Sequence, residues 1–184
     1  MKVLVFLAEG FEEVEALTVV DYLRRTEIEV DTVSITQDKS VKGAHDIIVM
    51  ADKILSDINH PQVYDGVVIP GGIPGATKLR DNKDVIDIVK QLDEKKKLVA
   101  AICAGPIVLE EAGIIEGKNI TSYPGFEDQL EGCVYCEDRV VRDGHIITSR
   151  GPSIAADFVM EIIDYLQGQG KINQLKESIL YELE

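Results

Sequence analysis

Apolar runs rich in β-branched residues alternate along the chain with segments of helical periodicity. The predicted strands span residues 3–7, 30–35, 66–69, 98–102, 119–122 and 145–149. Their apolar residues are continuous rather than alternating, which is typical of strands buried on both faces of a parallel sheet. The predicted helices span residues 12–26, 84–95, 106–112 and 153–166. This β–α repetition predicts an α/β fold, with a doubly wound sheet and helices on both of its faces.

Three segments depart from this rhythm. Residues 41–52 alternate around Gly43, which predicts a small hairpin or an edge strand. Residues 134–149 contain an Asp-Gly turn at Asp143 and Gly144, so some antiparallel strands are expected beside the parallel core. Residues 172–183 carry an apolar helical stripe that we expect to pack on the body or on a partner subunit. The stripe consists of Ile172, Leu175, Ile179 and Leu183. Because no linker, repeat or low-complexity stretch interrupts the chain, residues 1–184 are predicted to form one domain.

Composition and charge narrow the classes of function. The chain has 184 residues, 45% of them hydrophobic, which suits one domain with a full core. Its formal net charge of −14 repels phosphate backbones and anionic lipids, so neither nucleic acid nor membrane is an expected partner. No stretch approaches the roughly 18 apolar residues of a membrane span. Three cysteines are an odd count and do not suggest a disulfide scaffold, so we expect a cytoplasmic protein.

Cys103 stands at the most informative turn of the chain. It follows the apolar strand 98–102 and precedes Ala104, Gly105 and Pro106, where the next helix is predicted to begin. Only small residues fit around a nucleophile elbow, the sharp strand-to-helix turn that holds a reactive side chain at the carboxyl edge of a sheet. The helix N-terminus is expected to lower the pKa of Cys103 below its usual value of about 8.5. The alternative is a buried packing cysteine.

A glycine-rich loop at residues 70–75 follows the third predicted strand at the same edge of the sheet. It matches neither the phosphate-binding loop pattern nor the dinucleotide-binding fingerprint. We favour a backbone nest that forms an oxyanion hole facing the cysteine, with the N–H groups of Gly72 and Ala104 as donors. A phosphate cradle and a plain turn are the alternatives.

Histidines and the other cysteines offer no second centre. His45, His60 and His145 lie in unrelated contexts, with no carboxylates at metal-ligand spacing in the sequence, so neither a metal nor a cofactor is expected. Cys133 and Cys136 have the spacing of a redox or zinc motif, but there is no second pair to complete a zinc site. They enter a predicted strand, where residues three apart face opposite sides. We interpret the pair as incidental, and a redox role is the minor alternative.

Four motifs together resemble the ThiJ/PfpI superfamily. They are A-E-G-F-E-E-V-E, V-V-I-P-G-G, A-A-I-C-A-G-P and T-S-R-G-P, in this order, and the resemblance covers about residues 2–166. It is greatest to the branch of the parkinsonism-associated protein deglycase and its bacterial relative YajL. The resemblance implies a flavodoxin-like sheet and a homodimer. It also implies that Cys103 is the nucleophile and that Glu15 is a protonated carboxyl group hydrogen-bonded to the thiolate. The residues alone do not distinguish Glu15 from Glu12 and Glu13, which a solvated helix start would also explain.

Departures from the family pattern argue against a hydrolase. The peptidase-like branch has a histidine directly after the cysteine, where this chain has Ala104. The deglycase branch often has a histidine in the strand after the elbow, and here Tyr123 stands in that place. A tyrosine can hydrogen-bond a substrate, but with an ordinary pKa near about 10 it is a poor base at neutral pH. His45 replaces a family arginine, and Arg25 matches another.

Three functions follow from these residues. In the first, Cys103 attacks a small α-oxoaldehyde such as methylglyoxal, Gly72 and Ala104 hold the oxyanion, and Glu15 moves the proton, as in glyoxalase III or deglycase chemistry. In the second, the protein is a redox sensor, a protector against oxidative stress or a chaperone, and an oxidant converts its low-pKa Cys103 to sulfinic acid. The third is a flavodoxin-like binding module for flavin or nucleotide. The first two use the same residues, so the sequence does not separate them.

Overall fold

Seven strands form the central sheet of the computed structural model, which describes residues 1–181. In spatial order they are β10 (Val140–Asp143), β11 (Ile146–Ser149), β7 (Leu98–Ile102), β6 (Gly66–Ile69), β1 (Lys2–Leu7), β2 (Glu29–Ser34) and β5 (Lys53–Ile54). Every neighbouring pair in this sheet is parallel except β10 and β11. The predicted flavodoxin-like, mostly parallel α/β sheet is therefore confirmed.

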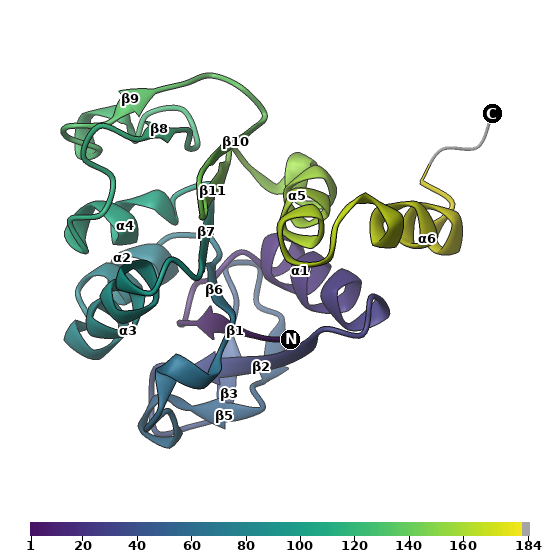
Figure 1. The fold of residues 1–184 in the computed structure, drawn as a ribbon. Coiled ribbons are helices and arrows are strands. Elements are labelled where there is room, and N and C mark those ends of the chain that lie inside the picture. Colours follow the sequence, from purple (N-terminus) through teal and green to yellow (C-terminus); the bar gives the residue numbers. More distant parts are fainter. Residues whose placement is uncertain (182–184) are drawn as a thin grey trace.

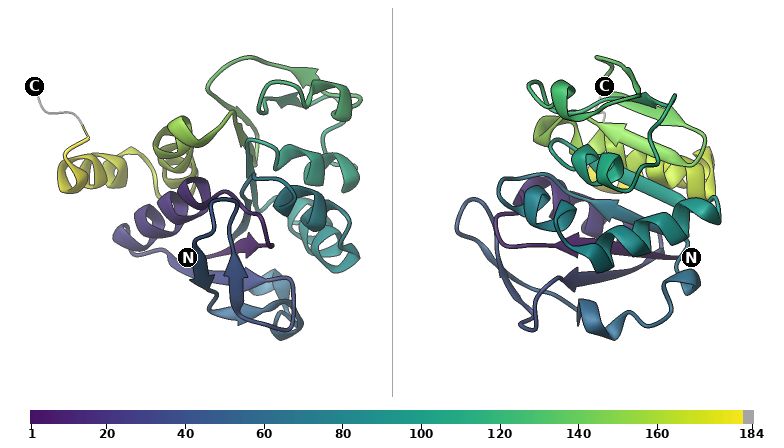
Figure 2. Two further views of the ribbon diagram at one scale, coloured as in Figure 1. Left: turned by 180° about the vertical axis from the view of Figure 1, so that it is seen from behind. Right: turned by 90° about the vertical axis from the view of Figure 1, so that its left-hand side faces the viewer.

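Helices cover both faces of the sheet (Figure 1). On one face lie α1 (Glu13–Arg25) and α5 (Ala155–Gln167), and α6 (Gln169–Ile179) packs outside α5. On the other face lie α2 (Gly75–Arg80), α3 (Lys83–Glu94) and α4 (Pro106–Glu111), which stand in front of the sheet in the right-hand view of Figure 2. Short 3-10 turns connect several elements: η1 (Leu55–Asp57), η2 (Pro61–Val63), η3 (Glu127–Gln129) and η4 (Pro152–Ile154).

The two apolar cores explain why the strand sequences are continuously apolar. Side chains alternate across a strand, so Val3, Val5 and Leu7 of β1 pack into the core under α1 and α5. Leu4 and Phe6 of the same strand pack into the opposite core, under the other three helices. All five side chains are fully buried. A strand in the middle of such a sheet has no face left for polar residues.

Two hairpins occur where the sequence predicts antiparallel pairing. β3 (Ser40–Lys42) and β4 (Ile48–Met50) form a separate two-stranded sheet, and β10 turns into β11 through Gly144 with φ of 65°. The hairpin prediction for residues 41–52 is confirmed. One edge strand of the central sheet is β5, which lies just beyond that segment.

The predicted strand at residues 119–122 is wrong as a member of the central sheet. Only β8 (Asn119–Ile120) is extended there, and it pairs with β9 (Val134–Tyr135) in a small parallel sheet. After β8 the backbone no longer pairs with a strand. Thr121 N instead donates a hydrogen bond to a side chain, Thr148 Oγ1, at 3.0 Å. β10 already occupies the position beside β11, so residues 119–122 cannot pair with β11.

Helix ends follow local capping. Glu12 caps α1, and Asn82 caps α3 by accepting from the N–H groups of Asp84 and Val85. The short helix α2 was not predicted, because its six residues are too few to show a period. The predicted tail helix is confirmed over Gln169–Ile179, with Ile172 and Leu175 buried, whereas Leu183 lies outside the described residues. Within residues 1–181, no helix has the length and apolar character that spanning a membrane requires.

Candidate active site

Cys103 lies in the turn between β7 and α4 and has a strained backbone. Its φ of 63° is in the left-handed region, which non-glycine residues rarely adopt. Two hydrogen bonds fix this conformation: Cys103 N donates to Ser149 O at 2.9 Å, and Tyr123 N donates to Cys103 O at 2.9 Å. A Cβ atom on Gly105 would lie 2.6 Å from Ile69 O, so a larger residue does not fit there. These features are those of a nucleophile elbow.

Glu15 lies in the first turn of α1 and is completely buried. Its Oε2 accepts a hydrogen bond from Gly71 N at 2.8 Å. Its Oε1 is also buried and has no hydrogen-bond partner among the described residues. A buried carboxylate oxygen without a donor is unfavourable, so this environment favours the neutral carboxyl group.

Gly71 is the point at which the cysteine and the glutamate converge. A Cβ atom on Gly71 would lie 2.6 Å from Cys103 Cβ and 2.7 Å from Glu15 Oε2. The two side chains therefore meet across a residue that has no side chain of its own. The sequence analysis pointed to the glycine-rich loop but did not single out Gly71 as the residue between the two side chains. The pair of adjacent glycines shortly after β6 was the signal that could have indicated it.

The pKa values of the pair correct one prediction from the sequence. Burial raises the pKa of Glu15 to about 7. Burial, followed by the charge of Glu15, raises the pKa of Cys103 to about 12. The expected lowering by the helix N-terminus is wrong, because a half-buried thiol beside a carboxylate is harder to ionise. The two groups interact directly, so between these pH values the pair holds one proton in common.

Two backbone N–H groups interact with the cysteine thiol. Those of Ala104 and Gly72 favour the thiolate and lower the pKa of Cys103, though by less than burial and Glu15 raise it. Gly72 adopts φ of 86°, and a Cβ atom there would lie 2.4 Å from Gly10 O. The loop is thus arranged as the nest hypothesis requires. The phosphate-cradle alternative is disfavoured, since Gly71 N already bonds the Glu15 carboxyl group.

Tyr123 lies at the rim of this site. Its backbone bonds the carbonyl of Cys103, and its side chain is 48% exposed. The ring lies over Gly151, where a Cβ atom would come within 3.3 Å of it. The backbone of Tyr123 thus lies beside the elbow, and contact of its side chain with a substrate stays a prediction.

The neighbouring glutamates are not merely solvated. Glu13 is 3% exposed, and its Oε1 and Oε2 bond His45 N at 2.7 Å and His45 Nδ1 at 2.8 Å. Glu12 Oε1 lies 3.8 Å from the same Nδ1. The expectation that no histidine lies among carboxylates at ligand spacing is wrong for His45, because the fold brings the β3–β4 turn onto the start of α1. One ligand atom from each of the three residues lies within 4.8 Å of the others. The hydrogen bonds between Glu13 and His45 account for this arrangement without a metal.

Cys133 and Cys136 flank the short strand β9 as free thiols. Cys133 Sγ contacts Leu130 O at 3.3 Å and packs toward the core under α4, whereas Cys136 Sγ lies near Asn119 Oδ1 at 3.9 Å. These separate partners agree with the interpretation of the pair as incidental.

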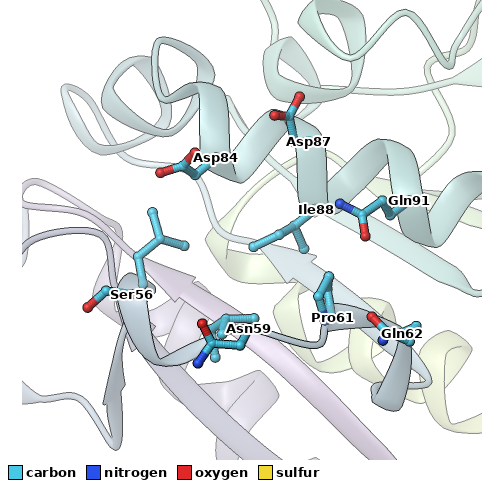
Figure 3. A pocket seen from close by; sticks show the side chains of 10 residues that line it. Ser56, Asn59, Pro61, Gln62, Asp84, Asp87, Ile88 and Gln91 are labelled. Carbon is cyan, nitrogen blue, oxygen red and sulfur yellow. The ribbon is translucent and has the colours of Figure 1, made fainter.

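A hollow of about 350 Å³ lies elsewhere, between α3 and residues 55–62 (Figure 3). Polar side chains predominate in its lining, among them Ser56, Asn59, Asp84 and Asp87. It contains neither a cysteine nor a histidine, so the chemistry of the chain points to Cys103 instead.

The fold and the elbow define a flavodoxin-like α/β protein with a cysteine at the carboxyl edge of its sheet. The chain belongs to the DJ-1/PfpI family, which it matches over residues 1–165. It is 35% identical to the Parkinson disease protein 7 homolog of Danio rerio, over 97% of this chain and 96% of that protein. It is 36% identical to protein dj-1beta of Drosophila melanogaster, over 96% and 95%. Among solved structures, oxidized DJ-1 of Toxoplasma gondii superposes with a TM-score of 0.93 at 36% identity, covering 99% of each chain.

Proposed function

We propose that this protein converts small α-oxoaldehydes such as methylglyoxal into hydroxy acids, using Cys103 and Glu15 and no cofactor. One observation carries the proposal. A completely buried carboxyl group, with Oε1 lacking any hydrogen-bond partner among residues 1–181, is set directly against a partly buried thiol at a strained elbow. Buried, paired titratable groups of this kind are typical of catalytic sites.

The single proton of the pair belongs on Glu15 in the reactive state. When Glu15 is neutral, its charge no longer opposes ionisation of the thiol, and its carboxyl group can donate a hydrogen bond to the sulfur. The N–H groups of Gly72 and Ala104 supply further donors to the thiolate. The pair then contains a nucleophile and an acid, although the thiol alone has a high pKa.

The reaction needs no external oxidant or reductant. The thiolate forms a C–S bond to the aldehyde carbon, and the carbonyl electron pair moves to oxygen, where Gly72 and Ala104 can donate to it. Glu15 gives its proton to that oxygen, which completes the hemithioacetal and leaves Glu15 as a carboxylate. The carboxylate then takes the C–H proton of the hemithioacetal and returns it to the neighbouring carbon, while the hydroxyl proton passes from one oxygen to the other, so one carbon is oxidised and the other reduced. Water then cleaves the resulting thioester, which releases lactate and restores the thiol.

Lactate formation from methylglyoxal tests the proposal. Cys103→Ala is expected to abolish turnover, and Glu15→Gln to reduce it by at least about a hundredfold, the range for a lost acid–base group. Cys136→Ser is the matched control, because it removes a partly exposed thiol outside the site. Unchanged turnover in Cys103→Ala would remove the proposal.

Oxidation of the same thiol is a second candidate function. Two N–H donors and a neutral carboxyl group around the sulfur would also stabilise sulfinate oxygens. That a related protein was solved as oxidized DJ-1 supports this candidate. Peroxide treatment followed by peptide mass spectrometry should show two oxygen atoms added at Cys103. Uniform oxidation of all three cysteines would contradict a selective sensor.

We also propose that the protein acts as a homodimer. Exposed apolar side chains gather on α1 and on the adjoining hairpin: Val14, Leu17, Ile47, Ile48 and Met50. An apolar surface of this kind is typical of a contact between subunits. Light scattering of the wild type and of Met50→Lys tests this, and a monomeric wild type would contradict it.

A further inference from the structure

Glu12 lies between the buried acid Glu15 and the exposed histidine His45. Its Oε2 accepts a hydrogen bond from Glu15 N at 2.7 Å, which caps helix α1. Its Oε1 lies 3.8 Å from His45 Nδ1. The Glu12 side chain is only 12% exposed, whereas that of His45 is 68% exposed. A partly desolvated carboxylate thus connects a surface cation to the first turn of the helix that carries Glu15.

The charged groups around Glu15 are few. Glu15 faces the Cys103 thiol from the elbow, the Gly71 N–H from the glycine loop and the Glu12 carboxylate from its own helix. The negative charge of Glu12 opposes the ionisation of Glu15 and adds to the effect of burial. Glu12 is thus a neighbouring carboxylate whose charge raises the pKa of Glu15 without any contact with the cysteine.

His45 offsets that negative charge from the other side. It faces Glu13, Glu12 and Asp46, of which Glu13 contributes most to raising the pKa of His45. Asp46 is itself paired with Lys42, so it is partly neutralised. These neighbours raise the pKa of His45 and so favour its imidazolium form, whose positive charge lies 3.8 Å from Glu12 Oε1.

We propose that Glu12 and His45 are positioning residues with opposite electrostatic effects, which together set how tightly the pair of Glu15 and Cys103 holds its protons and hence the pH at which the first proton leaves and Cys103 becomes a thiolate. Glu12 strengthens proton binding by the pair, and His45 weakens it by neutralising Glu12. The inference rests on the proposed role of Glu15 as the proton holder of the pair. It adds two residues that touch neither the substrate nor the sulfur.

The pH profile of Cys103 alkylation by iodoacetamide tests the inference, read at the Cys103 peptide by mass spectrometry. Glu12→Gln keeps an oxygen that can cap α1 but removes the charge, so the midpoint should move to lower pH. Unit charges about 6 Å apart interact by an amount equivalent to roughly 0.5 pH units in water and roughly 2 at an effective dielectric constant near 20. His45→Gln should move the midpoint to higher pH by a smaller amount within the same range.

Matched substitutions separate a local effect from a change in net charge. Glu9→Gln removes an exposed glutamate that pairs with Lys78, and His60→Gln removes an exposed histidine before η2. Neither should move the midpoint. In the double variant Glu12→Gln/His45→Gln, the effect of losing His45 should shrink, because the carboxylate that couples it to Glu15 is gone.

Opposite shifts in the two single variants would support the inference. Equal midpoints, or shifts in the same direction, would overturn it, since a loosened helix start would change both variants alike. His45→Gln alone decides the sign if Glu12→Gln does not fold, because His45 is exposed. Alkylation requires no turnover, so inactivity toward methylglyoxal would reject the proposed reaction while leaving this measurement able to succeed or fail.

Discussion

Gly71→Ala adds a single methyl group at the point where Cys103 and Glu15 meet. The new Cβ atom would lie 2.6 Å from Cys103 Cβ and 2.7 Å from Glu15 Oε2, and ordinary contact begins at 3.4 Å. The surrounding groups must therefore move by about 0.8 Å to accept it. Gly71 does not have a positive φ, so alanine introduces no backbone strain of its own. The substitution is thus a steric test of the pair.

A displacement of about 1 Å in a catalytic group can reduce the rate roughly a hundredfold. We therefore expect kcat/KM for methylglyoxal to fall by about that factor in Gly71→Ala. Alkylation of Cys103 at pH 7 should also change, because the carboxyl group that shares its proton has moved. Overpacking of this size should lower the free energy of unfolding by about 1–3 kcal/mol, which urea denaturation measures.

Gly170→Ala is the matched control. Gly170 lies in α6, where an added Cβ atom would meet nothing within 4 Å, so neither activity nor alkylation should change. Wild-type turnover together with wild-type alkylation in Gly71→Ala would refute the claim that close approach of the two side chains controls the site.

Further predictions concern the acids, the rim and the paired cysteines. Native Glu15 has a pKa of about 7, above the ordinary value of 4.5, so the native state holds the proton longer and stability should fall as pH rises between these values. In Glu15→Gln, the decrease in the free energy of unfolding between pH 5 and pH 8 should be smaller by up to about 3 kcal/mol, which urea denaturation at the two pH values measures. Glu13→Ala should release the β3–β4 hairpin, with faster amide exchange there and a loss of about 2–4 kcal/mol, whereas protection of the hairpin would contradict its role. Tyr123→Phe should raise KM if the hydroxyl binds substrate, and an unchanged KM would limit Tyr123 to packing. Mild oxidation should give no Cys133–Cys136 disulfide, which peptide mapping checks.

Much of the fold could be predicted because its signals are local. The strand β1 is continuously apolar, as a strand between two helix layers must be, and the Asp-Gly turn at Gly144 needs a residue with positive φ. The segment after residue 118 was misassigned for a non-local reason. Its apolar residues suit a strand, but β10 occupies the position beside β11. The pattern of apolar residues does not reveal which of two candidate strands pairs with β11.

The site was predictable only in part. The elbow at Cys103 has a sequence signature, because small residues must surround it. The different roles of Glu13 and Glu15 have no such sequence signature. Residues two apart on a helix point to nearly opposite sides, so the two side chains were bound to diverge. Which of them meets the cysteine depends on where the turn after β7 lies relative to α1. The pKa of Cys103 was missed for the same reason, since burial and Glu15 outweigh the local donors.

Departures from ordinary folding rules gather at this one place. Cys103 has a positive φ, Glu15 has a buried oxygen without a partner within residues 1–181, and Gly71 leaves no space for a side chain. The first two are unfavourable by themselves, and the surrounding sheet, in which residues 3–7 of β1 and all of β7 are buried, holds them in position. A packing role does not explain this combination, because a neutral, fully bonded side chain at residue 15 would be more stable. The strain is therefore an argument for chemistry at Cys103, and the gain in stability predicted for Glu15→Gln at pH 8 measures how much stability the site gives up.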